Sequence, residues 1–182
     1  MLFLTSQDVE LRKAQGLKES DLYKPSTERV NRAAEIVGQV TEAFEGVKLG
    51  MGVGLFEGQA IDNYDGDEER AKLREKDEKE DWRRIESMDL IDCHSSLSFF
   101  DTLGMRFHLP AFICSELKGE FGEGLDITLS GLNDWNRPKF GLLSSQQQSA
   151  VATFLEFLAQ DADSEFSRES IERDLVEYWT VS

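Results

Sequence analysis

The sequence has few of the residues that build disulfide frameworks, metal centres or irregular loops. Its 182 residues include two cysteines, two histidines and three prolines. So few cysteines in a chain of this length predict reduced core residues rather than a disulfide scaffold. No window approaches the roughly 20 apolar residues of a membrane span, and residues 1–24 lack the features of a signal peptide. The sequence therefore predicts a cytoplasmic protein that does not enter a membrane.

Positive charge is also scarce relative to negative charge. Thirty-six Asp and Glu face 20 Lys and Arg, which gives a formal net charge of −16. A surface of this kind repels nucleic acid and anionic membranes and favours a basic protein partner. Hydrophobic residues make up 40% of the chain, too many for a disordered acidic segment. The length predicts a single domain over residues 1–182.

Apolar spacing predicts a predominantly helical α+β domain with about five helices. These are expected near residues 27–44, 55–63, 68–82, 145–159 and 167–179. The stretch 68–82 has few apolar residues, and its helix is expected to be supported by ion pairs between neighbouring charges. Residues 1–24 are expected to form a peripheral N-terminal segment, and residues 160–182 an acidic C-terminal helix. Ser26 and Ser145 are the expected N-caps of two of the helices.

The middle of the chain has a different pattern, which predicts a small antiparallel hairpin or sheet. Residues 98–110 are expected to form two extended segments joined by a turn at Asp101–Gly104. The stretch Leu125–Gly131 alternates apolar and polar residues with a period of two, as a strand does. Pro110 is expected in the first turn of a helix over residues 111–117.

No catalytic motif stands above background. Gly50, Gly52 and Gly54 form a glycine-rich stretch that lacks the Lys-Ser/Thr of a P-loop, so a flexible loop is preferred over a phosphate cradle. The run Asp62–Glu69 does not fit an EF-hand, although a looser cation site remains an alternative. The soft ligands Cys93, His94, His108 and Cys114 match no structural zinc spacing. No cofactor or metal is therefore expected.

Two acidic regions are the strongest candidates for binding a partner, one at residues 62–92 and one from Glu156 onward. A negative face would steer a basic protein, and an aromatic side chain beside it would serve as a hot spot. The alternative is a charged solubility surface with its aromatics packed inward. The predicted partner-binding residues are Asp62, Asp65, Asp67, Glu68, Glu69, Trp82, Glu165, Glu169, Glu172, Asp174, Glu177, Tyr178 and Trp179.

Several short motifs resemble a bacterial family of unknown function. They are Asp81-Trp-Arg-Arg-Ile85, Leu97-Ser-Phe-Phe-Asp101 and Gly104-Met-Arg-Phe-His-Leu-Pro-Ala-Phe112, followed by Phe140-Gly-Leu-Leu and residues 147–157. Residues 43–46, Ala-Phe-Glu-Gly, match the end of a helix in that family. The resemblance covers about residues 28–158. Two segments look peculiar to this chain: the Gly50–Gly54 stretch inside that range, and the acidic tail after residue 160. It implies a bacterial cytosolic protein and no activity.

These observations favour a protein-binding module over an enzyme. By analogy with other small acidic bacterial proteins, the most specific hypothesis is an immunity protein or antitoxin that neutralises a basic toxin domain by direct binding. One alternative is a nucleic-acid mimic that inhibits a DNA-binding protein. Another is a metal-assisted hydrolase that uses Asp62, Asp65 and Asp67.

Overall fold

The computed structural model describes residues 6–16, 18, 25–160 and 165–180, and this part of the chain is helical. It contains nine α-helices and no sheet, so the expected α+β domain with about five helices is wrong. The helices are α1 Ser6–Ala14, α3 Thr27–Ala43, α4 Leu55–Asp62, α5 Asp67–Lys76, α6 Ser87–Asp92, α7 Thr102–Leu117, α8 Leu125–Leu129, α9 Ser145–Ala159 and α10 Glu165–Asp174. Short 3₁₀ turns η1 Trp82–Arg84, η2 His94–Ser98 and η3 Arg137–Phe140 connect them, and a π-helical turn η4 Leu175–Trp179 follows α10.

The predicted hairpin at residues 98–110 is wrong, because most of this segment belongs to the central helix α7. Asp101 is its N-cap and accepts a hydrogen bond from the backbone N–H of Gly104 at 2.7 Å. Pro110 lies inside the helix rather than at its start. All residues from Phe107 to Leu117 are buried. A helix enclosed on every side has no polar face, so the 3.6-residue pattern that identifies amphipathic helices is missing.

The predicted strand at Leu125–Gly131 is also wrong, and no strand occurs anywhere in the described residues. The segment instead contains α8. Leu125 and Leu129 are buried, whereas Ile127 is exposed. Residues four apart share a face in a helix as well as in a strand. The alternation therefore fits both structures until the environment of the middle residue is known.

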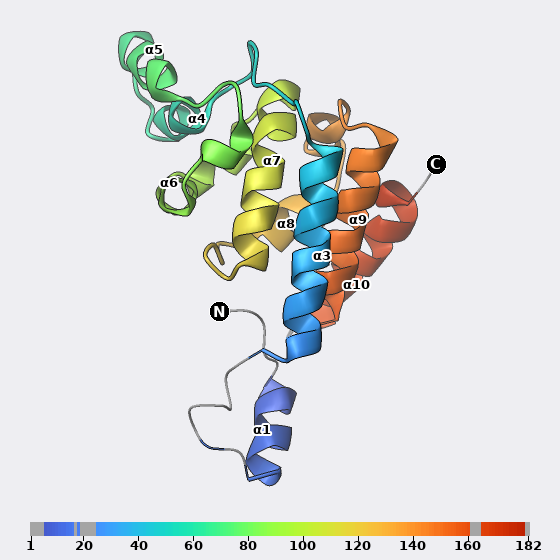
Figure 1. The fold of residues 1–182 in the computed structure, drawn as a ribbon. Helices are drawn as coiled ribbons and strands as arrows, with labels where there is room; N and C mark the ends of the chain where they lie inside the picture. Colours follow the sequence, from blue (N-terminus) through green and yellow to red (C-terminus); the bar gives the residue numbers. More distant parts are fainter. Residues whose placement is uncertain (1–5, 17, 19–24, 161–164, 181–182) are drawn as a thin grey trace.

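The core forms where α3, α7 and α9 pack together. Helix α7 contacts α3, α6 and α8, while α9 packs between α3 and α10. Figure 1 shows α3, α9 and α10 on one side of α7 and α4, α5 and α6 on the other. The largest fully buried side chains include Phe44, Phe107, Phe112, Phe140 and Phe154. Burial of apolar area on this scale is the main force that stabilises the fold.

The amphipathic helices were predicted closely, with differences at their ends. Helix α3 is capped by Ser26, as expected. Helix α9 has its capping box at Ser144 and Gln147, one residue earlier than the predicted box. Helix α5 ends at Lys76, six residues before the predicted end, because Asp77 adopts an extended conformation. Among the described residues, no helix is both long enough and apolar enough to span a bilayer.

Candidate functional site

The first predicted acidic region places its carboxylates around the start of α5. Asp67, Glu68 and Glu69 are exposed in the first turn, while Asp62 and Asp65 are half-buried in the preceding segment. Lys72 lies 3.2 Å from Glu68 and 3.4 Å from Glu69. The acids of this region are thus interleaved with cations of the same helix, which weakens its negative field.

The second region is less neutralised. Glu169, Glu172 and Glu177 are exposed on α10 and η4. Asp174 is fully buried, and its Oδ2 accepts a hydrogen bond from the Leu132 backbone N–H at 2.8 Å, so it is a structural residue rather than a docking residue. Glu165 begins α10, and its side chain lies outside the described part of the structure.

The aromatics that were predicted as hot spots point inward. Trp82 and Trp179 are buried, and their indole N–H groups donate to the carbonyls of Phe44 and Leu129, each at 3.0 Å. Tyr178 is half-buried and packs edge-on against Trp179. Trp82 and Trp179 therefore pack inward, as the alternative interpretation of the sequence expected, and neither can contact a partner.

The third tryptophan is the exposed one. Trp135 is 89% exposed. Its loop is held by Asn133, whose Oδ1 accepts hydrogen bonds from the backbone N–H groups of Trp135 and Asn136, at 2.9 and 3.4 Å respectively. Asn-Asp-Trp-Asn is a turn signal with an aromatic residue inside it. That combination is the feature of the sequence that could have identified Trp135.

The Trp135 loop is attached to the acidic C-terminal helix. Leu132 binds Asp174 as described, and the Arg137 guanidinium lies over the Tyr178 ring at 5.3 Å from its centre. These two contacts join the loop that carries the exposed Trp135 to α10 and η4, which carry exposed carboxylates. We call Trp135, Glu169, Glu172 and Glu177 the C-terminal face.

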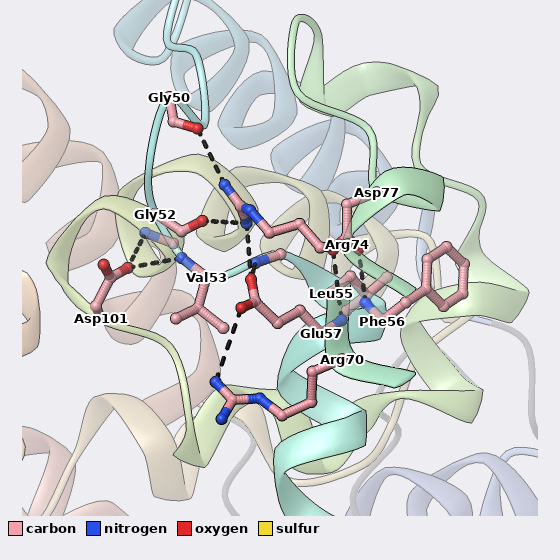
Figure 2. Close-up of polar contacts among 12 residues, drawn as sticks. Gly50, Gly52, Val53, Leu55, Phe56, Glu57, Arg70, Arg74, Asp77 and Asp101 are labelled. Carbon is pink, nitrogen blue, oxygen red and sulfur yellow. Dashed lines mark hydrogen bonds and ion pairs between the residues drawn. The ribbon is translucent and has the colours of Figure 1, made fainter. Parts of the chain in front are cut away.

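The glycine-rich stretch is an ordered loop, not a flexible connector. The Arg74 guanidinium donates to the carbonyls of Gly50 and Gly52 and forms an ion pair with Glu57 at 2.8 Å (Figure 2). Both charges are largely buried by the loop, with side-chain exposures of 22% and 15%. The ion pair and the two bonds to loop carbonyls together engage both terminal nitrogens of the guanidinium, and charge-assisted hydrogen bonds of this kind are the strong ones.

Carboxylates occupy the places where a phosphate cradle would need free N–H groups. The Val53 N–H donates to Asp101 at 3.0 Å, and the Gly54 N–H donates to Glu57 at 3.3 Å. The Phe56 N–H, at the N-terminus of α4, donates to Asp77 at 2.7 Å (Figure 2). The loop therefore binds the protein's own acids, and a second anion would be repelled.

Asp77 and His108 are two buried titratable residues near this loop. Burial raises the pKa of Asp77 to about 6, although its hydrogen bonds from the Phe56 and Glu57 N–H groups act in the opposite direction. Burial likewise lowers the pKa of His108 to about 4. The Nδ1 of His108 lies 2.8 Å from the Gly104 carbonyl. A carbonyl only accepts, so Nδ1 carries the proton and Nε2 is a bare acceptor.

The remaining chemical candidates show no arrangement for catalysis. Cys93 and Cys114 are free and buried, and burial raises the pKa of each thiol to about 11, which keeps both protonated. In the ranges that the structure covers, no three His, Cys, Asp or Glu side chains converge to hold a metal ion. Asp62, Asp65 and Asp67 accordingly do not form such a group.

Comparison with known proteins identifies one family. The model of a family of unknown function, DUF6714, matches residues 32–182. The matched range runs through the Gly50–Gly54 loop and the acidic tail. No curated protein and no solved structure matches the chain.

Proposed function

We propose that this chain, which belongs to the family of unknown function DUF6714, is an acidic module that binds a basic protein through its C-terminal face. The observation that carries the proposal is Trp135, an exposed indole on a loop held by its own hydrogen bonds. Large exposed aromatics are the commonest hot spots of protein interfaces. The carboxylates of the adjoining helix supply the complementary charge for a basic partner.

In its most specific form, the proposal is an immunity protein or antitoxin that blocks a basic toxin domain by occlusion. The excess of negative charge supports this form, since it raises the rate of association with a basic partner. A nucleic-acid mimic is less favoured, because mimicry needs an unbroken row of carboxylates. On α5, within the first acidic region, Arg70 and Lys72 interrupt such a row.

A pair of alanine variants tests which acidic region docks. Among the described residues, a strongly exposed aromatic is available for each region: Trp135 at the C-terminal face, and Tyr64, 95% exposed, just before α5. We expect Trp135→Ala to weaken binding about 30-fold, equivalent to about 2 kcal/mol. Tyr64→Ala should leave the affinity unchanged. The measurement is the affinity for the basic protein encoded by the adjacent gene, determined by calorimetry at several salt concentrations.

Salt serves as the second readout, because contacts between exposed charges weaken as ionic strength rises. Two results contradict the proposed face. One is an affinity that does not change with salt concentration, and the other is a complex that Tyr64→Ala weakens but Trp135→Ala does not. The absence of any complex with the neighbouring basic product removes the immunity form of the proposal.

A further inference from the structure

A second feature, separate from the C-terminal face, is a pocket of about 450 Å³ that lies between α4, α6, α7 and the segment from Lys76 to Ile85. Its volume is within the usual range of small-molecule sites, about 300–1,000 Å³. Leu55, Phe56 and Ile85 supply apolar walls. Asp77 also lines the pocket, and Figure 2 shows its carboxylate beside the backbone of Phe56.

The inner wall of the pocket presents acceptors. His108 lines it and is fully buried, and its Nε2 has no hydrogen-bond partner. Asp77 is 6% exposed, and its carboxylate keeps free lone pairs beside the two hydrogen bonds that it accepts. Asp89 is half-buried and forms no ion pair with any residue that the structure describes. The Arg74 guanidinium is close enough to lower the pKa of Asp77, but it is engaged by Glu57 and the loop carbonyls. Neither Asp77 nor Asp89 forms an ion pair within the described residues, so the inner wall is complementary to a positively charged donor.

The outer rim has the opposite charge. Lys76 and Arg84 are exposed and Lys79 is half-buried, and none of the three forms an ion pair within the described chain. The rim acids are already engaged. Glu78 accepts the backbone N–H groups of residues 79–81, and Glu80 pairs with Lys48 at 2.5 Å. The rim therefore offers cations to an anionic group.

We propose that this pocket binds a small zwitterion with an apolar body, of the α-amino-acid type. Its ammonium group faces Asp77, Asp89 and the bare Nε2 of His108, while its carboxylate faces the lysines and the arginine at the rim. The apolar side chain packs against Leu55, Phe56 and Ile85. Three ammonium N–H donors match three inner acceptors: the unpartnered Nε2 of His108, the carboxylate of Asp89, and that of Asp77, which keeps lone pairs beside the two hydrogen bonds that it accepts.

The ligand arm of the test uses the full chain and L-leucine, titrated by calorimetry and by thermal shift. Two analogues isolate the charged ends: N-acetyl-L-leucine lacks the ammonium group, and L-leucinamide lacks the carboxylate. We expect saturable binding of L-leucine and affinities at least about tenfold weaker for both analogues. No binding of L-leucine, L-isoleucine or L-phenylalanine up to about 10 mM overturns the proposal, as does equal binding of the analogues.

The protein arm uses two matched pairs of variants. Asp89→Asn removes an inner carboxylate, whereas Asp92→Asn changes an exposed residue of the same helix that does not line the pocket. Arg84→Gln changes the rim, and Arg83→Gln changes its neighbour outside this pocket. We expect Asp89→Asn and Arg84→Gln each to weaken L-leucine binding about tenfold, with both controls unchanged. Equal effects within either pair count against the site. No protein partner is needed, so the result is independent of the proposed function.

Discussion

Replacing Gly54 with alanine should destabilise the protein by about 3 kcal/mol, one of the largest effects expected from a single methyl group here. A Cβ at this position would lie 1.8 Å from Oδ2 and 2.1 Å from Cγ of Asp77. Asp77 cannot withdraw without losing its hydrogen bond to the Phe56 N–H at the N-terminus of α4. Gly54 thus leaves room for a capping carboxylate that comes from 23 residues further along the chain.

Gly66→Ala is the matched control, since Gly66 is also a helix N-cap with extended backbone and no side-chain cap. Nothing lies within 4 Å of a Cβ added there, so we expect a cost of about 1 kcal/mol or less. The measurement is the free energy of unfolding by urea titration. A double variant, Gly54→Ala with Asp77→Ala, should be more stable than the sum of the single effects predicts, because the clash is gone. Similar costs for the two glycines would refute the steric explanation.

How far the sequence could predict this fold depended on whether each helix had a polar face. Helix α3 buries Ala33, Ile36 and Val40 on one side and exposes charges on the other, so the helical spacing of its apolar residues is visible in the sequence. Helix α7 is buried on all sides, so it has no polar face, and its sequence does not show the helical alternation of apolar and polar residues. The Ser26 cap could also be predicted from the sequence, because it is a contact between residues only three positions apart, Ser26 and Arg29.

The site was harder to predict because its contacts join residues far apart in the chain. The capping of α4 by Asp77, and the bonds from Arg74 to the Gly50–Gly54 loop, depend on how α5 folds back on α4. The three tryptophans could not be ranked for exposure, since burial depends on neighbours supplied by the tertiary structure. Trp179 lies at the end of η4 and is buried, whereas Trp135 lies in a turn and is exposed.

The stability of the protein should depend weakly on Asp77 and His108 between pH 4 and 6.5, because two large and opposite effects cancel. The pKa of Asp77 rises on folding from 3.8 to about 6, so the native state holds its proton more tightly and this contribution to stability is lost as pH rises through 6. The pKa of His108 falls on folding from 6.5 to about 4, so its contribution is lost as pH falls through 4.

Single variants should uncover each effect. A shift of two or more pKa units corresponds to about 3 kcal/mol over the whole window. Relative to the parent protein, Asp77→Asn should therefore gain about 3 kcal/mol of stability as pH rises from 4 to 6.5, and His108→Gln should lose about as much over the same range. Each variant also carries a constant cost from altered packing, which does not change the slope.

The measurement is the free energy of unfolding by urea titration at several pH values across this window, expressed as the difference between variant and parent. Difference curves remove the other titrating groups, such as Asp89 and Glu116, whose pKa values burial also raises. Two slopes of opposite sign are expected. Flat difference curves for both variants, or slopes of the same sign, would show that these two buried side chains do not titrate as their surroundings dictate. Opposite slopes would mean that a buried acid just after α5 and a buried imidazole within α7 together hold the stability of the fold nearly constant through mild acid.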